Sequence, residues 1–314
     1  MDRKPVSVKS YANIAIVKYW GKADAERMIP STSSISLTLE NMYTETKLSF
    51  LPEDATGDVM YIDDELQGEK ETTKASKVLD LFRTNPNQHV KIETWNNMPT
   101  AAGLSSSSSG LSALVKATNE LFQVGKTQSE LAQIAKFASG SSSRSFFGPL
   151  AAWDKDSGEV YQVETDLKLA MIMLVLTDQK KPVSSRDGMK LCTETSTSFP
   201  EWIKQSELDY KDMLAYLKAN DFKAVGELTE ANALRMHQTT STANPPFSYL
   251  TDASYQAMDK VKALRASGEQ CYFTMDAGPN VKVLCLEEDL DRLADHFRKN
   301  YEVIVSRTKE LPDA

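Results

Sequence analysis

The sequence has 314 residues, of which 41% are hydrophobic and 25% are charged. This composition is typical of a globular protein and excludes a disordered or collagen-like chain. The 36 Lys and Arg against 44 Asp and Glu give a net charge of -8, which argues against a nucleic-acid-binding surface, because phosphate contacts need a dense basic face.

The length predicts two domains, since a domain usually contains roughly 100 to 200 residues. The longest apolar run, residues 169–176, is shorter than the roughly 20 residues of a membrane-spanning helix. The first residues, MDRKPVSVKS, carry neither an apolar signal core nor a cleavage pattern, so we expect a cytoplasmic protein. The 3 cysteines fit neither a disulfide framework nor a zinc site and are expected to be buried thiols.

The first half of the chain predicts strands followed by helices. Strands are expected at residues 6–10, 44–51, 59–62 and 89–95; TETKLSFL and HVKIETW among them alternate polar and apolar side chains. An apolar stripe with helical period predicts a helix over about 111–122. A second helix begins at Thr127, which forms a capping-box pattern with Glu130.

The second half predicts mostly helices. The aliphatic run 169–177 is typical of a central strand, and the polar segment DQKKPVSSRDG after it is interpreted as a domain crossover or functional loop. Helices are then expected at about 200–218, 221–238, 252–266 and 287–299, and strands near 270–275, 281–286 and 301–305. Because helices and strands do not alternate strictly, the pattern favours an α+β fold.

A serine-rich segment, PTAAGLSSSSSG at residues 99–110, lies between a predicted strand and a predicted helix. By composition alone it is typical of a flexible linker. Its position favours a phosphate-binding loop, because a helix N-terminus offers unpaired N–H groups and Gly103 allows close backbone approach. The sequence contains neither a Walker A string nor a Gly-x-Gly-x-x-Gly fingerprint.

A second serine cluster, SGSSSRS at residues 139–145, follows the capped helix. Gly140 is placed to cap that helix, so one interpretation is an ordinary helix terminator. Arg144 among hydroxyls favours an anion site, because a guanidinium binds carboxylate or phosphate through two parallel hydrogen bonds.

Two further segments carry charged residues in polar or turn contexts. ANIAIVKYWGK at 12–22 contains Lys18 and Lys22 at what could be an ordinary strand end. TMDAGPNV at 274–281 brings Asp276 to a strand end before a Gly-Pro turn, where a carboxylate is either a base or an ordinary turn residue.

Taken together, ANIAIVKYWGK, PTAAGLSSSSSG, SGSSSRS, SSRDGM and TMDAGPNV resemble, in this order and over nearly the whole chain, the diphosphomevalonate decarboxylases of the GHMP kinase superfamily. KYWGK and SRS are specific to the decarboxylases, whereas the serine loop and the DAGPN turn are shared in outline with the sister kinases. Ser105 and Ser108 stand where the family often has alanine, and Ser143 where it often has cysteine.

The resemblance implies a two-domain α+β fold of GHMP-kinase type with the active-site cleft between the domains. We expect an N-terminal nucleotide-binding domain at 1–180, a C-terminal α+β domain at 181–314 and a homodimer. The implied reaction uses ATP and Mg²⁺ to phosphorylate the tertiary hydroxyl of mevalonate 5-diphosphate. Loss of phosphate and CO₂ then gives isopentenyl diphosphate, in the mevalonate pathway of isoprenoid biosynthesis.

The resemblance also implies roles for individual residues. Asp276 would deprotonate the hydroxyl beside Lys18, and Arg144 would hold the carboxylate. The expected substrate-binding residues are Tyr19, Lys22, Ser139, Gly140, Ser141, Ser185, Arg186 and Met189. The expected ATP-binding residues are Pro99, Gly103, Leu104, Ser105, Ser106, Ser107, Ser108 and Lys180. Of these, Ser106 and Ser107 are also expected near the metal, mainly through the ATP phosphates.

Three alternatives differ in class. A mevalonate-type kinase would stop after phosphoryl transfer, and KYWGK argues against it, since those kinases share a Gly-Glu-His-like string there. A serine hydrolase is disfavoured because no Gly-x-Ser-x-Gly elbow occurs and His89, His237 and His296 lie in no motif. A ligand-binding or regulatory member of the fold stays open.

Overall fold

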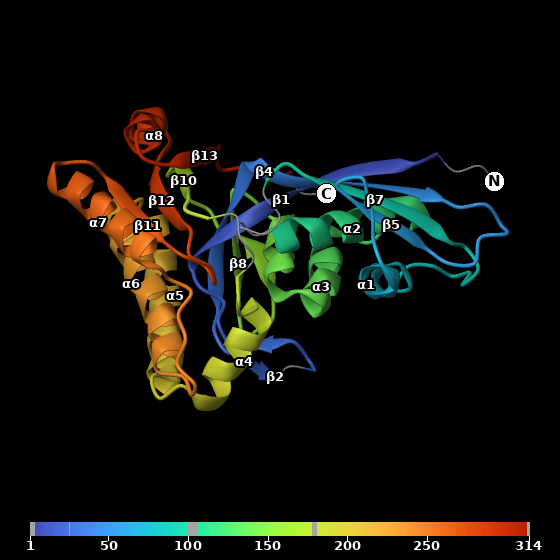
Figure 1. Ribbon diagram of the computed structural model, residues 1–314, viewed down its shortest axis with the longest axis horizontal. Coiled ribbons are helices and arrows are strands. Elements are labelled where there is room, and N and C mark those ends of the chain that lie inside the picture. Colours follow the sequence, from blue (N-terminus) through green and yellow to red (C-terminus); the bar gives the residue numbers. More distant parts are fainter. Residues whose placement is uncertain (1–3, 25, 99–105, 178–180, 313–314) are drawn as a thin grey trace.

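The computed structural model describes residues 4–24, 26–98, 106–177 and 181–312, and its two halves lie end to end (Figure 1). One half is built on a seven-stranded sheet and the other on a four-stranded sheet. Helices accompany both sheets, which confirms the predicted α+β class.

The seven-stranded sheet is organised around the long strand β4 (Ser34–Phe50). Strand β1 (Val6–Val17) pairs antiparallel with β4 along almost its whole length. The other strands are β5 (Val59–Ile62), β6 (Glu65–Leu66), β7 (Val90–Asn96), β8 (Leu150–Trp153) and β9 (Val160–Gln162). They follow the order β6-β5-β7-β4-β8-β9, and among the described strands only β5 and β7 pair in parallel. A separate hairpin joins β2 (Lys22–Asp24) and β3 (Ile29–Pro30).

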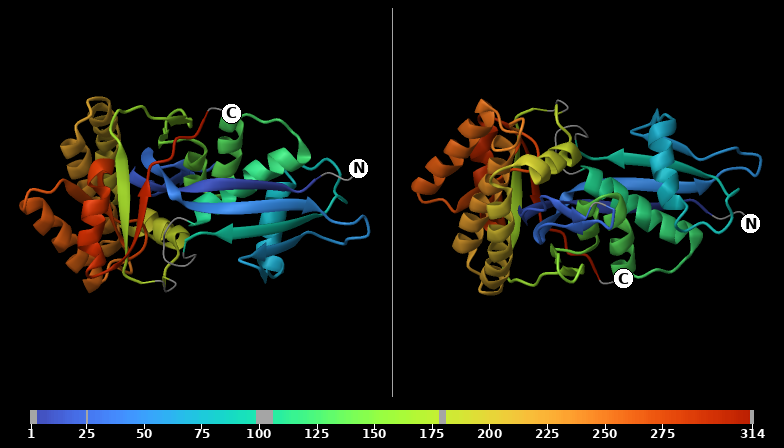
Figure 2. Two further views of the ribbon diagram at one scale, coloured as in Figure 1. Left: turned by 90° about the horizontal axis from the view of Figure 1, so that it is seen from above. Right: turned by 90° about the horizontal axis from the view of Figure 1, so that it is seen from below.

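Three helices, α1 (Glu69–Leu79), α2 (Ser106–Phe122) and α3 (Gln128–Ala138), cover one face of this sheet (Figures 1 and 2). Apolar side chains such as Val78, Leu121 and Leu131 fill the space between them and the strands. The predicted capping box is present: the Glu130 backbone N–H donates to the Thr127 side chain, and the Glu130 carboxylate accepts from the Thr127 N–H at 2.8 Å.

The four-stranded sheet is antiparallel in the order β11-β12-β10-β13. Its strands are β11 (Cys271–Thr274), β12 (Val281–Leu286), β10 (Leu169–Val175) and β13 (Glu302–Arg307). Helices α7 (Asp252–Ala266) and α8 (Leu290–Arg298) pack against the face that carries Ile172, Phe273 and Val283. A short 3-10 turn, η2 (Glu287–Asp289), leads into α8.

One apolar core joins the two halves of the molecule. Helices α5 (Phe199–Lys218) and α6 (Phe222–Ser241) contribute Met213 and Val225 to it, β10 contributes Met171, and the first sheet contributes Ile14 and Leu37. After β13 the chain returns to β4, where Thr308 bridges to Leu39 and the N–H of Lys309 donates to Thr38 at 2.8 Å.

The strand period of two explains how β1 and β4 serve this core and a polar site together. Ile14, Ile35 and Leu37 point into the joining core, whereas their sequence neighbours Asn13 and Ser36 point to the other face. The polar side chains on that other face are buried as well, because they surround Arg144.

Most predicted elements are present, and the differences have physical causes. The segment interpreted as a crossover loop becomes helical from Ser185, where α4 (Ser185–Thr195) begins after an N-cap at Ser184. Gly188 inside this helix is required because a Cβ there would collide with the Tyr249 hydroxyl. The polar helix α1 and strands β8 and β9 were not predicted.

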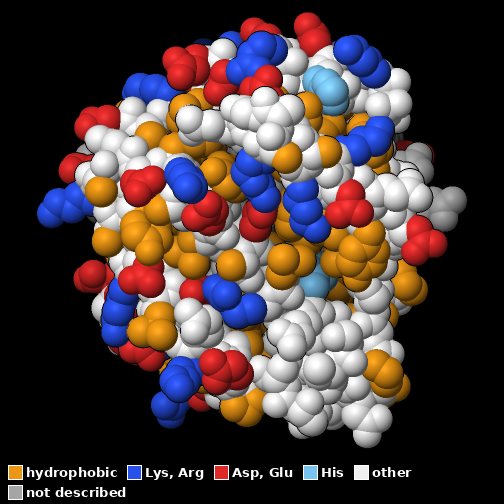
Figure 3. All heavy atoms as spheres, turned by 90° about the vertical axis from the view of Figure 1, so that its left-hand side faces the viewer, with side chains coloured by type: hydrophobic (Ala, Val, Ile, Leu, Met, Phe, Trp, Pro, Cys, Tyr) orange, Lys and Arg blue, Asp and Glu red, His pale blue; other side chains and the backbone are white. Residues whose placement is uncertain are grey.

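The other expectations have mixed outcomes. All three cysteines are buried and free, as predicted. Within the described residues, no helix is long and apolar enough to cross a membrane. The division of the chain after residue 180 stays a prediction, although β10, which precedes it, pairs within the second sheet. On the face formed by the α6–α7 end, described acidic and basic side chains are interspersed (Figure 3).

Candidate active site

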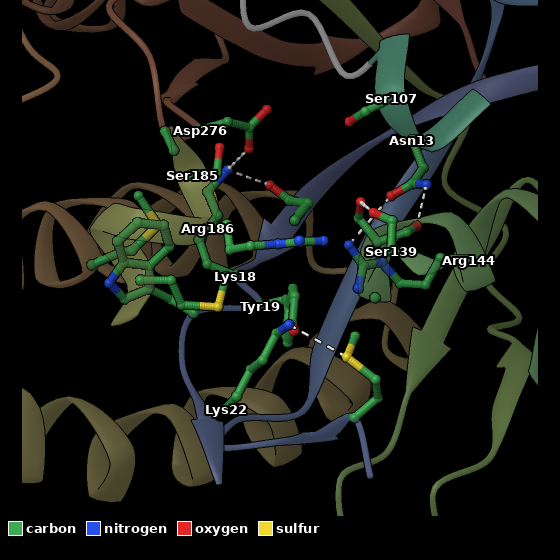
Figure 4. A pocket seen from close by; sticks show the side chains of 18 of the residues that line it. Asn13, Lys18, Tyr19, Lys22, Ser107, Ser139, Arg144, Ser185, Arg186 and Asp276 are labelled. Carbon is green, nitrogen blue, oxygen red and sulfur yellow. Dashed lines mark hydrogen bonds and ion pairs between the residues drawn. The ribbon is translucent and has the colours of Figure 1, made fainter. Parts of the chain in front are cut away.

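A cavity of about 550 Å³ opens where the end of β1, helix α4 and the turn after β11 meet (Figure 4). The residues predicted for catalysis and substrate binding all line it: Asp276, Lys18, Arg144, Tyr19, Lys22, Ser139, Gly140, Ser141, Ser185, Arg186 and Met189. Segments more than 200 residues apart in sequence therefore meet at one place, with residues of both halves in its wall.

Asp276 and Lys18 form the expected contact in this cavity. The Lys18 Nζ lies 2.8 Å from Oδ1 of Asp276 and also donates to the carbonyl of Ala15 at 2.7 Å. Burial alone would raise the pKa of Asp276, but Lys18 and Lys282 outweigh it and hold that pKa well below its usual range. Burial lowers the pKa of Lys18 to about 8, against the opposing attraction of Asp276.

Arg144 is 2% exposed and lies on η1 (Gly140–Phe146), the 3-10 helix that follows α3. Its guanidinium donates to Ser36 Oγ at 2.9 Å, Ser34 Oγ at 2.6 Å and Asn13 Oδ1 at 3.3 Å. These acceptors are neutral, so they orient the cation without balancing its charge. Burial lowers the pKa of Arg144 to about 10, which leaves it charged at neutral pH. An orientated cation of this kind favours an anionic ligand.

Gly140 does not cap α3 as predicted. The C-cap is Ser139, and Gly140 starts η1 without the positive φ of a glycine cap. A Cβ at this position would lie 2.9 Å from the rings of both Tyr19 and Trp153. Gly140 is therefore present for close packing, which allows Tyr19 to stand beside the serines of η1.

Further cations and hydroxyls line the cavity. Lys22 and Arg186 both face the cavity, and burial together with the Arg186 charge lowers the pKa of Lys22 (Figure 4). Burial raises the pKa of Tyr19 to about 12, so its hydroxyl keeps its proton. Ser185 opens helix α4, and its Oγ accepts from Lys181 Nζ at 2.6 Å.

The predicted ATP loop is only partly described. Pro99, Gly103, Leu104, Ser105 and Lys180 lie outside the described residues, and Ser106 is described only as the first residue of α2. Ser107 is exposed at this helix N-terminus and lines the cavity, as expected of a phosphate-binding hydroxyl. Ser108 is 1% exposed and is absent from the described cavity wall, so its place at the nucleotide stays a prediction.

Comparison with known proteins gives the same assignment over the whole chain. Residues 10–163 match the model of the diphosphomevalonate decarboxylase-like N-terminal domain, and residues 171–312 match that of the mevalonate 5-diphosphate decarboxylase C-terminal domain. The diphosphomevalonate decarboxylase of Candida albicans is 30% identical over 94% of this chain and 88% of its own. The chain belongs to the diphosphomevalonate decarboxylase family.

Two solved structures show that the family fold extends over the full length. Mevalonate pyrophosphate decarboxylase from Streptococcus pyogenes is 67% identical, with a TM-score of 0.97 over 100% of this chain and 99% of that chain. MDDEF in complex with MVAPP, AMPPCP and magnesium is 40% identical, with a TM-score of 0.89 over 98% of each chain. The two-domain fold expected of a diphosphomevalonate decarboxylase is thereby confirmed.

Four polar residues at or near the cavity were not among the predicted site residues. Asn13 donates to the carbonyl of Ser141 at 2.9 Å and accepts from Arg144. Lys181 donates to the carbonyl of Ala277 at 2.8 Å, and Lys282 lies 2.9 Å from Oδ2 of Asp276. Lys282 is the one charged residue in the otherwise apolar strand VKVLCL, and this was the sequence signal that could have marked it as a functional residue.

His237 is the fourth missed residue. It is 6% exposed on α6, and burial together with the nearby charge of Lys18 lowers its pKa to about 4. It is therefore neutral at physiological pH beside the Asp276 cluster. Its sequence surroundings, RMHQTT, carry no motif that could have placed it there.

Proposed function

We propose that this protein catalyses the ATP-dependent decarboxylation of mevalonate 5-diphosphate to isopentenyl diphosphate, releasing ADP, phosphate and CO₂ in the mevalonate pathway of isoprenoid biosynthesis. The observation that carries this proposal is that one cavity contains both a carboxylate bound by a lysine, Asp276, and more cationic than anionic side chains. Its relatives are diphosphomevalonate decarboxylases, and a structural neighbour binds MVAPP together with the ATP analogue AMPPCP.

The charges of the cavity suit this substrate. The described lining residues include one carboxylate, Asp276, and more cations than this carboxylate can balance: Lys18, Lys22, Arg144, Lys181 and Arg186. Mevalonate 5-diphosphate carries a diphosphate and a carboxylate, whose negative charges would balance these cations. We assign the diphosphate to Tyr19, Lys22, Ser139, Ser141, Ser185 and Arg186.

We assign Asp276 as the group that accepts the proton of the tertiary hydroxyl, because it faces the cavity and is held ionised by Lys18 and Lys282. The hydroxyl oxygen attacks the γ-phosphorus of ATP, the bond to the ADP oxygen breaks and the hydroxyl proton passes to Asp276. A carboxylate held by two ammonium groups is a weak base, which suits a loose transition state in which the hydroxyl loses its proton late.

Arg144 would hold the carboxylate that departs. The new phosphate leaves with the electrons of its carbon–oxygen bond, and the carbon–carbon bond to the carboxylate then breaks. That electron pair forms the double bond of the product while CO₂ is released. The guanidinium uses only part of its five N–H donors on Ser34, Ser36 and Asn13, so donors remain for the substrate.

We propose Mg²⁺ as the metal, which neutralises phosphate charge when bound with ATP. No group of three or more His, Cys, Asp or Glu that could hold a metal occurs among the described residues. We infer that the ATP phosphates would hold most of the magnesium coordination, with Ser106 and Ser107 at the helix N-terminus beside them. Magnesium typically keeps several waters and substrate phosphates as ligands, so the site fits this metal.

One assay tests the proposed reaction. The protein is incubated with ATP, magnesium and mevalonate 5-diphosphate, and ADP, phosphate and CO₂ are measured over time. We expect the three products in equal amounts. ADP without phosphate or CO₂ would indicate a kinase, and substrate binding without any product would indicate a ligand-binding protein.

Two further parts of the proposal, a homodimer and a cytoplasmic location, rest on the family resemblance. Light scattering of the purified protein tests the first: a mass of one 34.9 kDa chain would contradict it. Fractionation of cells that express the native gene tests the second.

A further inference from the structure

Lys282 is the second cation on Asp276, and the function proposed above assigns it no contact with substrate or ATP. It lies on β12, opposite Thr274 of β11, and is 1% exposed. Its Nζ lies 2.9 Å from Oδ2 of Asp276, while Lys18 holds Oδ1 at 2.8 Å. The two oxygens of one carboxylate are therefore bound by two different buried ammonium groups.

The two lysines differ in their access to ligands. Lys18 lines the cavity, whereas Lys282 is absent from the described cavity wall and lies behind Asp276. An anionic ligand can therefore reach Lys18 directly, and it can reach Lys282 only by displacing Asp276.

Lys18 alone could not balance the charge of Asp276 while it also contacts phosphate. Phosphate groups that approach Lys18 compete with Asp276 for its ammonium group. If Lys18 were the sole partner, Asp276 would be left as a buried, unpaired carboxylate beside incoming negative charge, which is strongly unfavourable. A second ammonium group on Oδ2 removes that cost.

Stability alone is a weak explanation for this lysine. Burying an ion pair gains little over apolar residues of similar size, and Lys282 is the one charged residue in the strand VKVLCL. Other charged or titratable groups near Asp276 are Arg144 on η1, Lys181 before α4 and neutral His237 on α6.

We propose that Lys282 is a positioning residue for phosphoryl transfer, which holds Oδ2 of Asp276 and supplies its counter-charge so that Lys18 is free to contact phosphate. This inference rests on the proposed function for its chemical consequence. The electrostatic coupling of Lys282 to Lys18 does not depend on turnover, because the positive charge of Lys282 is one cause of the lowered Lys18 pKa.

Lys282→Met removes the charge at similar length, Lys282→Arg retains it, and Lys211→Met on the exposed surface of α5 serves as control. The titration of Lys18 is followed by NMR of ¹³C-lysine-labelled protein and assigned with Lys18→Arg. We expect the Lys18 pKa to rise above about 8 in Lys282→Met and to stay near 8 in Lys282→Arg and in the control. An unchanged value in Lys282→Met would overturn the coupling.

Kinetics test the chemical part in the same variants. For Lys282→Met we expect kcat to fall at least about tenfold while the KM values of ATP and mevalonate 5-diphosphate change less than about threefold. Lys282→Arg should recover most of kcat. Loss of thermal stability with normal kcat would make Lys282 merely structural and overturn the proposal. If Lys282→Met does not fold, Lys282→Gln is measured in its place with the same expectations.

The two proposals fail in different ways. Wild-type protein that releases no CO₂ would contradict the proposed reaction, whereas the NMR titration would still decide the coupling of the two lysines. Normal wild-type turnover with unaltered Lys282 variants would contradict only the role of Lys282.

Discussion

Asp276 is bound by two ammonium groups and faces the cavity, so its substitution tests the proton-accepting role. Asparagine has nearly the same shape but cannot take a proton. We expect kcat of Asp276→Asn to fall by roughly 10² to 10⁴-fold, and ADP and CO₂ formation to fail together because phosphorylation comes first. Thermal stability should also fall, since Lys18 and Lys282 lose their counter-ion.

Product analysis of this variant is compared with Asp259→Asn, an exposed aspartate on α7. The control should behave as wild type. ADP formation at the wild-type rate without CO₂ would assign Asp276 to the second step instead of the first.

Arg144 tests whether geometry or charge alone is needed. Arg144→Lys keeps the charge but loses the planar group that bonds Ser34, Ser36 and Asn13 together. Losing charged hydrogen bonds of about 1.5 to 3 kcal/mol predicts a fall in kcat/KM of roughly ten- to a hundred-fold. Steady-state kinetics beside Arg298→Lys, on the surface of α8, measure this. Retention of most activity in Arg144→Lys would mean that the planar guanidinium geometry is not needed for the reaction.

Lys18 sets the expected dependence of activity on pH. Its protonated form balances Asp276 and attracts phosphate, and that form is lost as the pH rises through its pKa of about 8. We therefore expect kcat/KM to fall above about pH 8. We expect kcat to fall only at a higher pH, because bound anions stabilise the protonated ammonium group of Lys18 and raise its pKa. A pH–rate profile from 6.5 to 10 measures both limbs, and a flat profile of kcat/KM would contradict the assignment.

At the scale of elements, η1 carries Arg144 and Ser141, its N-cap is Ser139, and Gly140 sets the distance of η1 from Tyr19. In Gly140→Ala the new methyl group would press on Tyr19 and Trp153, although the backbone conformation itself suits alanine. We expect the KM of mevalonate 5-diphosphate to rise several-fold while that of ATP changes little.

The matched control is Gly57→Ala, where the added Cβ meets no atom within 4 Å. Equal KM values in both variants would show that Tyr19 and η1 adjust freely and that their spacing is unimportant.

Sequence patterns predicted elements well where the environment follows the usual rules. The capping box of α3 and the aliphatic strand β10 are both present near their predicted places. The patterns failed at α4, because Gly188 disfavours a helix until Tyr249 packs against it. The first half of β4 was missed although it alternates polar and apolar residues, and its polar side faces Arg144 instead of solvent.

The candidate site shows the same limit. Lys18, Arg144 and Asp276 could be found because they lie in motifs. Lys282 and His237 lie in no motif. A lysine in the apolar strand VKVLCL indicates a buried charge but not its partner, and only the pairing of β11 with β12 and the packing of α6 bring the two residues to Asp276.

For the whole molecule, the core that joins both sheets predicts one cooperative unfolding transition, although two separate transitions are common in chains of two domains. Residues of β1, β4, β10, α5 and α6 share this core, so neither half can lose it alone. Calorimetry and near-UV circular dichroism should give one coincident transition. Two transitions at different temperatures would show that the halves are energetically independent.

The path of the chain through this core has a consequence for folding during synthesis. Strand β10 leaves the ribosome about a hundred residues before its partners β12 and β13, and Thr308 and Lys309, which contact β4, follow after β13. The second sheet and its apolar faces therefore stay incomplete until these later segments have been made. A nascent chain in that state is prone to aggregate, so chaperones that shield apolar surface are expected to raise its yield, and shortening the C-terminus before residue 308 to lower it.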